Sequence, residues 1–169
     1  MPPGTDKRTA ARGEWFRIGG YVSGFSVPSH PGSSSAAASS RMSLARRRDT
    51  KAEVLLRREL HAQGLRYRVA LPIASNRRRS IDIAFTRARL AVFVDGCFWH
   101  ACPEHGTAPV ANSEWWKTKL GANVARDRDT TRLLENSGWT VLRIWEHVEP
   151  GTAADIVVQA LLDLRAESP

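Results

Sequence analysis

Apolar residues recur along the chain with two different spacings, one typical of helices and one typical of strands. From Thr50 onward, apolar residues three and four positions apart predict an amphipathic helix that ends at Gly64. The spacing of Thr50 and Glu53 fits a capping box, which marks a helix start. Three short apolar runs then predict strands, at residues 65–71, 81–85 and 90–94. Only a short turn separates the last two strands, which indicates a hairpin.

The second half of the chain continues with longer segments. A loop at residues 96–112 precedes a helix over residues 113–137, with Ser113 as its expected cap and a glycine as its stop. Residues 139–145 predict another strand, and a final helix is expected to start at Thr152. The order helix, three strands, helix, strand, helix predicts an α/β fold in which helices flank a mixed central sheet.

The first forty residues differ from the rest in composition. The stretch at residues 33–40, with sequence SSSAAASS, is of low complexity and cannot bury a core. We therefore expect residues 1–40 to be a disordered N-terminal extension that is dispensable for folding, and residues 41–169 to form one domain. No basic start is followed by a long apolar segment, so we expect no secretory signal. No apolar run approaches the roughly 18 residues of a membrane span.

The chain is basic, and its charge is unevenly distributed. It holds 25 Lys and Arg against 17 Asp and Glu, a net charge of +8, which favours a polyanionic partner such as nucleic acid. Residues 41–89 alone contain 14 basic and 4 acidic residues. Two clusters stand out in this segment, residues 46–48 and the run Arg77, Arg78 and Arg79. They are either solvated loops or contacts to DNA phosphates.

Both cysteines of the chain lie in one short stretch together with a histidine. Cys97, Cys102 and His105 have the spacing C-x4-C-x2-H, and thiolates with imidazole suit a tetrahedral zinc ion. A closed structural site needs a fourth ligand, and His147 after the last strand is the candidate. The alternative is a pair of inert thiols beside surface histidines. Two cysteines also exclude a disulfide-stapled scaffold.

Three ordered motifs carry a resemblance to a known family. DGCFWH at residues 95–100, NVARDR at residues 123–128 and GWTVLRIWE at residues 138–146 resemble motifs of the very short patch repair endonucleases, the Vsr family. Residues 49–56 match as well, and the resemblance covers about residues 41–150. It implies a restriction-endonuclease-like core with a structural zinc. It also implies a magnesium-dependent nick 5′ of the T in a T:G mismatch, the product of 5-methylcytosine deamination.

The resemblance also implies which residues hold the magnesium ion. Asp82 matches the catalytic aspartate, and a carboxylate suits Mg²⁺, which prefers oxygen ligands. The main-chain oxygen of Val94 is implied as the second protein ligand. Asp95 stands where the family's best-known member has a histidine near the metal, and Glu53 matches an acid of the first helix. From the residues alone, Asp82 can instead pair with arginines 77–79, and Glu53 can serve only as a helix cap.

Two further residues are implied in proton transfer. His100 matches the family's general base, because an imidazole can take a proton from the attacking water near neutral pH. Asp127 matches a second acid, which orients a water bound to the metal. The alternatives are that His100 is itself a zinc ligand, and that Asp127 is a solvated charge among its charged neighbours.

Aromatic residues near these motifs match a DNA wedge. Phe98, Trp99 and Trp116 correspond to the side chains that the family inserts beside the mismatch. Unstacking costs a few kcal/mol and costs least at a mispaired step, so a wedge favours mismatched DNA. Asn123 follows Trp116 on the same helix face, and we count it with the DNA-binding residues. Of Trp115 and Trp116, we expect one in the core and the other exposed.

These expectations favour a DNA mismatch nicking endonuclease. The alternatives are a nuclease of the same fold with another target, such as a restriction activity, and a zinc-stapled DNA-binding module without catalysis. The expected partner is double-stranded DNA with a T:G mismatch, and the resemblance implies a functional link to a cytosine-5 DNA methyltransferase. A single-strand nick requires one protomer, so we expect a monomer in the bacterial cytoplasm, near the nucleoid.

Overall fold

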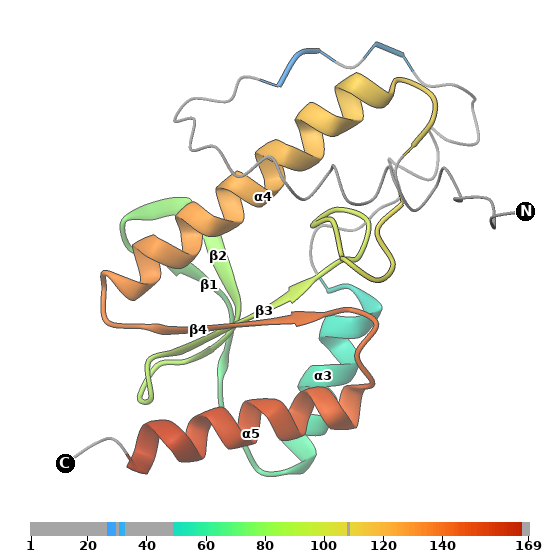
Figure 1. Cartoon of the computed structure of the whole chain (residues 1–169). Coiled ribbons are helices and arrows are strands. Elements are labelled where there is room, and N and C mark those ends of the chain that lie inside the picture. Colours follow the sequence, from blue (N-terminus) through green and yellow to red (C-terminus); the bar gives the residue numbers. More distant parts are fainter. Residues whose placement is uncertain (1–26, 30, 33–48, 108, 167–169) are drawn as a thin grey trace, which may run out of the picture. The chain divides into compact units, whose positions relative to one another are not determined.

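The computed structural model describes residues 27–29, 31–32, 49–107 and 109–166 (Figure 1). Most of the extension expected at residues 1–40, and the arginines at 46–48, lie outside this part of the chain. The described elements follow the predicted order, and they are α3 (Lys51–Ala62), β1 (Arg68–Ile73), β2 (Asn76–Phe85), β3 (Leu90–Asp95), α4 (Ser113–Glu135), β4 (Thr140–Trp145) and α5 (Pro150–Ala166).

The chain forms two compact units. Residues 49–96 and 128–166 make up the described part of the sheet unit, which holds all four strands. Residues 97–107 and 109–127, with the described N-terminal residues, make up the described part of the loop unit. None of the described helices is long and apolar enough to cross a membrane.

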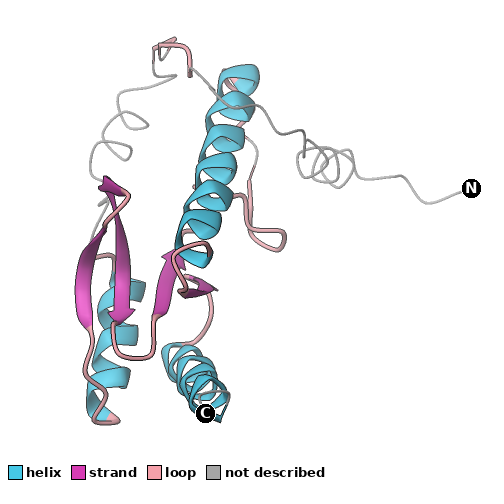
Figure 2. Ribbon diagram, turned by 90° about the vertical axis from the view of Figure 1, so that its left-hand side faces the viewer, coloured by secondary structure: helices cyan, strands magenta, loops and turns pink. Residues whose placement is uncertain are grey.

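The sheet has four strands in the order β1-β2-β3-β4 (magenta in Figure 2). The first two pairings are antiparallel, and β3 pairs with β4 in parallel. Residues Phe85 and Leu90 pair at the turn between β2 and β3, so the predicted hairpin is confirmed. The parallel pairing places Val92 opposite Leu142. The prediction of a mixed sheet with helices on it is therefore confirmed.

Two apolar clusters cover the sheet unit. The larger one joins the strands to α3 and α5, and its fully buried members include Leu60, Ile83 and Val157. The smaller one packs Leu134 near the end of α4 against strand residues such as Phe93. Full burial of such a side chain contributes about 1.5–3 kcal/mol. The two clusters cover both faces of the central strands, and β3 is a near-continuous apolar run because both of its faces are buried.

The start and end of α3 follow the sequence prediction. The Thr50 hydroxyl accepts a hydrogen bond from the Glu53 N–H at 3.3 Å. The Glu53 carboxylate in turn accepts from the Thr50 hydroxyl at 3.0 Å and from the Asp49 N–H at 3.1 Å. The capping interaction is thus confirmed, with Asp49 supplying the backbone donor. Gly64, at φ +78°, adopts the left-handed conformation expected where a helix ends.

Several element starts differ from the sequence prediction, among them that of β1, which begins at Arg68 instead of residue 65. Strand β2 begins at Asn76, so Arg77, Arg78 and Arg79 lie in a strand rather than in a loop. Ser113 lies inside α4, because the Trp116 N–H donates to the carbonyl of the preceding Asn112. Helix α5 begins at Pro150, two residues before Thr152. Proline suits a first helical position, where its missing N–H costs nothing, and the Glu149 carboxylate caps the helix by accepting from the Thr152 N–H at 2.9 Å.

Candidate functional site

The Asp82 carboxylate takes the place of a ladder hydrogen bond in the sheet. Strands β2 and β3 pair from Ile83–Val92 to Phe85–Leu90, and beyond this point Asp82 Oδ2 accepts a hydrogen bond from the Val94 N–H at 3.0 Å. The strand departs here from simple alternation, and Ile81 packs in the smaller apolar cluster while Ile83 packs in the larger one. Asp82 is therefore held at Val94, next to the main-chain oxygen expected to share its metal.

Acidic neighbours surround Asp82. The pKa of Asp82 is raised to about 6, mainly by burial; the nearby carboxylates of Glu53 and Asp95 add to the rise, and the Val94 N–H and the Arg143 guanidinium oppose it. A carboxylate is a hard oxygen donor of the kind that Mg²⁺ prefers, and the negative charges of Glu53 and Asp95 act on Asp82. Among the described residues, this chemistry fits Mg²⁺ at Asp82.

The raised pKa predicts that Asp82→Asn stabilises the protein at neutral pH. The folded protein keeps a proton on Asp82 that the unfolded chain releases near pH 4, so wild-type stability falls as the pH rises from about 4 to 6. The asparagine variant escapes this loss, worth about 3 kcal/mol at most, and its amide oxygen can still accept from the Val94 N–H. In buffer without magnesium, we expect a higher Tm for the variant above pH 6 and equal values below pH 4. Equal Tm at pH 7.5 contradicts the prediction.

The arginine run of β2 divides into two kinds of residue. Arg77 and Arg78 are exposed. The Arg79 guanidinium forms an ion pair with Asp129 at 2.6 Å and donates to the Thr130 hydroxyl at 2.9 Å. Arg79 therefore links β2 to α4. Because its ion pair is with Asp129, this contact does not support the alternative that Asp82 pairs with the arginine run.

A buried ion pair joins the ends of β3 and β4. Arg143 donates to both Asp95 oxygens, from Nε at 2.7 Å and from Nη2 at 2.8 Å, and its guanidinium carbon lies 4.9 Å from the centre of the Phe93 ring. Only 6% of the Asp95 surface is exposed. Sequence reasoning placed Asp95 near the metal but missed Arg143. The parallel pairing of β3 with β4, which sets Phe93 opposite Arg143, was the information it lacked.

In the loop unit, α4 positions the candidate general base. His100 Nδ1 lies 2.5 Å from the Asp127 carboxylate, and both side chains are mostly buried. A carboxylate on Nδ1 fixes the imidazole and leaves Nε2 to exchange a proton. Asp127 is thus a partner of His100 rather than a solvated charge. His100 is also absent from the group of candidate metal ligands found among the described residues.

Asn123 holds the residue that precedes His100. Its Nδ2 donates to the Trp99 carbonyl at 3.0 Å, its Oδ1 accepts from Arg126 at 3.1 Å, and only 5% of the residue is exposed. Because Asn123 and Asp127 are four residues apart on α4, they hold consecutive residues of the loop. Sequence reasoning assigned Asn123 to DNA contact and missed this structural role.

Four aromatic rings pack together in the loop unit. The Phe98 ring lies 5.0 Å from Trp99 and 5.2 Å from Trp116, and Trp115 lies 4.8 Å from Trp116, measured between ring centres. Trp116 is buried, with 8% exposed, whereas Phe98 and Trp99 are half-buried. Trp115 is half-buried too and donates to the Pro28 carbonyl at 2.9 Å. The expectation of one core and one exposed tryptophan is therefore right for Trp116 and wrong for Trp115, because residue 28 covers its indole nitrogen.

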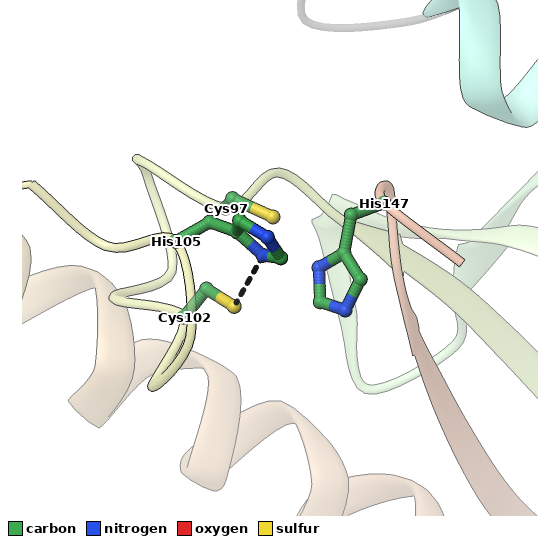
Figure 3. Close-up of side chains that lie close together, drawn as sticks. All are labelled: Cys97, Cys102, His105 and His147. Carbon is green, nitrogen blue, oxygen red and sulfur yellow. Dashed lines mark hydrogen bonds between the residues drawn. The ribbon is translucent and has the colours of Figure 1, made fainter.

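Two thiols and an imidazole lie together in the loop after β3. The ligand atoms of Cys97, Cys102 and His105 lie within 4.8 Å of one another (Figure 3), and both cysteines are buried and form no disulfide. Two tight turns bring them there, with the Cys102 N–H donating to the Cys97 carbonyl and the Gly106 N–H donating to the Cys102 carbonyl. This donor set fits a soft metal such as zinc. His147, the expected fourth ligand, follows β4 in the sheet unit.

The sequence comparisons agree with the motifs. The profile described as DNA mismatch endonuclease Vsr matches residues 34–104. The type II nicking enzyme V.NaeI of Lentzea aerocolonigenes is 44% identical over 156 residues, which cover 91% of this chain and 89% of the relative. The type II nicking enzyme V.NmeAIP of Neisseria meningitidis is 36% identical over 104 residues, covering 59% and 69% of the two chains.

A mismatch repair enzyme is among the relatives. The DNA mismatch endonuclease Vsr of Escherichia coli K12 is 37% identical over 103 residues, which cover 59% of this chain and 62% of the relative. The protein is therefore a DNA endonuclease, a hydrolase. The resemblance read from the sequence is confirmed, and the chain belongs to the DNA mismatch endonuclease Vsr family.

Proposed function

We propose that this endonuclease nicks double-stranded DNA 5′ of the T in T:G mismatches, in a magnesium-dependent reaction. The observation that carries the proposal is the Asp82 carboxylate, fixed on the Val94 N–H within an acidic site of a Vsr-family chain. We further propose that the mixed sheet and its helices form a restriction-endonuclease-like core. The link to a cytosine-5 methyltransferase, the monomeric state and a place in the cytoplasm near the nucleoid belong to the same proposal.

Asp82 and the Val94 main-chain oxygen would hold the magnesium ion. Bound there, Mg²⁺ supplies charge stabilisation for the transition state of phosphodiester hydrolysis. The Val94 N–H orients Asp82 Oδ2, so the carboxylate presents its other oxygen without a change of rotamer. Glu53 and Asp95 increase the negative potential at Asp82, which favours a cation over a proton at neutral pH.

His100 takes the proton in this mechanism. Asp127 holds Nδ1, so Nε2 accepts a proton from the water that attacks the phosphorus, and the Asp127 carboxylate stabilises the resulting imidazolium. The bond that breaks is the one between phosphorus and the 3′ oxygen of the preceding nucleotide, which leaves a nick. Asn123 keeps the Trp99 carbonyl, and with it the His100 backbone, in place.

Zinc has a structural role in the proposal. Cys97, Cys102, His105 and His147 would complete a tetrahedral set of two sulfur and two nitrogen ligands. The loop that carries the first three has few buried apolar residues of its own, so a metal would supply order that packing does not. His100 lies three residues after Cys97 and would be ordered with it.

DNA contacts divide into wedge and backbone contacts. Phe98 and Trp99 are the half-exposed edge of the aromatic cluster, supported by the buried Trp116, and would enter the duplex beside the mispaired step. Asn123 remains a predicted DNA contact beside its structural hydrogen bond. Exposed Arg77 and Arg78 would contact phosphates, which adds affinity without sequence preference.

The exposed arginines should set affinity and salt dependence. We expect the double variant Arg77→Ala/Arg78→Ala to weaken binding to matched and mismatched duplexes alike, and to reduce the slope of log K against log salt by roughly two, because each phosphate contact contributes about 0.9. The matched comparison is Arg79→Ala, which loses its bonds to Asp129 and Thr130 and should mainly lower the Tm. Fluorescence anisotropy at several salt concentrations measures the slopes. A loss confined to the mismatched duplex would count against this assignment.

The N-terminal residues should contribute little to folding. We propose that a chain beginning at Met42 keeps its sheet unit, because the carbonyls of Pro28 and Gly32 accept hydrogen bonds from Trp115 and Asn112, which belong to the loop unit. Two such bonds are worth about 1–3 kcal/mol, which corresponds to a Tm lower by about 2–10 °C at most. Thermal unfolding followed by circular dichroism tests this. Insoluble protein would show that the extension packs on the core.

The proposed function is tested by magnesium titration of nicking. A 5′-labelled T:G duplex is incubated with excess protein, with and without Mg²⁺, beside a C:G duplex of the same sequence. We expect a magnesium-dependent nick in the T strand alone. Cleavage of both duplexes supports a restriction-type nuclease, and binding without cleavage supports a DNA-binding module; either result overturns the proposal.

A further inference from the structure

The ion pair of Asp95 and Arg143 commits both oxygens of a buried carboxylate. Arg143 approaches Asp95 in the bidentate geometry typical of strong carboxylate pairs, at 2.7 and 2.8 Å. The Phe93 ring lies against the guanidinium and fixes it from the side. The Asp95 carbonyl accepts from the Glu146 N–H at 2.9 Å, so the residue is held by its backbone too. Each Asp95 oxygen therefore already accepts a hydrogen bond from a cation, and Arg143 offsets the negative charge of this carboxylate.

The same pair balances the charge beside Asp82. The charged side chains that act on Asp82 are two carboxylates, Glu53 and Asp95, and one guanidinium, Arg143. Without Arg143, the three carboxylates would act on one another with no guanidinium beside Asp95 to offset its charge. With Arg143, one of the three is neutralised locally, and Asp82 remains the carboxylate that faces an incoming cation.

We propose that Arg143 and Asp95 are positioning residues for the reaction, a paired cation and anion that set the divalent-metal affinity of Asp82 and reserve the metal for it. This inference rests on the proposed magnesium site at Asp82. Asp95 acts through Arg143 and is not itself a metal ligand. The Arg143 guanidinium occupies the position beside Asp95 that a second divalent ion could otherwise take.

A structural brace and a charge-balancing pair make different predictions. If the pair only holds the two strands together, removal of either partner causes the same structural loss. Substitution of Arg143 and substitution of Asp95 should then change the metal affinity in the same direction. A charge-balancing pair responds with opposite signs, because loss of Arg143 leaves an extra negative charge near Asp82 and loss of Asp95 leaves an extra positive charge. The sign of the two changes therefore separates the two roles.

The experiment uses Mn²⁺ as a paramagnetic substitute for Mg²⁺ and the full chain with its zinc. Binding is measured from the EPR signal of free Mn²⁺, without DNA, for Arg143→Gln and Asp95→Asn, whose amides can keep one hydrogen bond of the pair. We expect about tenfold tighter binding for Arg143→Gln and about tenfold weaker binding for Asp95→Asn. The double variant should return to within about threefold of wild type. Arg89→Gln, which removes a charge at the opposite end of β3, should change nothing.

A charge-preserving variant covers the case in which Arg143→Gln is too unstable to measure. Arg143→Lys keeps the positive charge and loses the bidentate geometry, so its Mn²⁺ affinity should stay near wild type while its nicking rate falls. Shifts of Arg143→Gln and Asp95→Asn in the same direction, no shift in either, or an Arg143→Lys affinity far from wild type would overturn the inference. Asp82→Asn separates this from the proposed function, since Mn²⁺ binding that survives Asp82→Asn refutes the metal site itself.

Discussion

Asp82→Asn abolishes nicking and leaves mismatch binding in place, if Asp82 carries the magnesium ion. The substitution keeps the size of the side chain and the acceptor for the Val94 N–H, and it removes only the negative charge and one anionic oxygen. Without a fixed cation, the reaction loses the electrostatic stabilisation that usually contributes most to such hydrolyses. The aromatic cluster and the exposed arginines are untouched, so the affinity for a T:G duplex should stay within a few-fold of wild type.

Substitution of Asp82 should slow nicking at least as much as substitution of His100. His100→Ala should slow nicking by about 10²–10⁴-fold, the usual scale for loss of a general base, and Asp82→Asn should cost at least as much. Asp127→Asn should resemble His100→Ala in direction, because it leaves the imidazole in place without its carboxylate. Asp155→Asn, an exposed acid of α5, is the matched control and should behave as wild type. Near-wild-type nicking by Asp82→Asn would refute the site.

Cys97→Ala should yield insoluble or chelator-sensitive protein with less than one zinc per chain. The thiols of Cys97 and Cys102 are buried next to His105, and zinc affinity contributes directly to folding where a loop has little core of its own. Apparent zinc affinities of structural sites are on the order of 10–16 kcal/mol, so loss of one thiolate is a large effect. The aromatic cluster and His100 follow Cys97 in the chain and should lose order with it.

Two measurements separate zinc loss from general damage. Metal analysis of wild type should give about one zinc per chain, and His147→Ala should lower it if His147 is the fourth ligand. Thr107→Ala, an exposed change in the same loop, should keep both zinc and activity. Active, freshly purified protein without zinc would refute the structural role.

The elements that could be predicted from the sequence are those with local causes. The capping box at Thr50 and Glu53 and the left-handed Gly138 after α4 each act within a few residues, and both are found as expected. The apolar run of β3 predicted a buried strand because both of its faces are covered. The start of β2 was missed because arginines 77–79 show no alternation, and the pairing with β1 on either side of them, at Asn76 and Ser80, is a property of the sheet.

In the candidate site, too, local sequence motifs could be predicted, whereas contacts between distant parts of the chain could not. The resemblance supplied Asp82, His100 and Asp127 as candidates, and their roles stay predictions. Arg143 was missed, since its partner Asp95 lies 48 residues away on a parallel strand and no local spacing connects them. The structural role of Asn123 was missed for the same reason, because its acceptor is a main-chain oxygen whose position depends on the loop.

The most direct test of the account is single-turnover nicking of one duplex that carries a T:G mismatch beside an otherwise identical C:G duplex, in the presence of Mg²⁺. Each strand is labelled at its 5′ end, and the product is sized to one nucleotide. We expect one cut, in the T strand, on the 5′ side of the T, with no product from the C:G duplex and none without Mg²⁺. Equal cutting of both duplexes, or cutting that persists without a divalent metal, would contradict it.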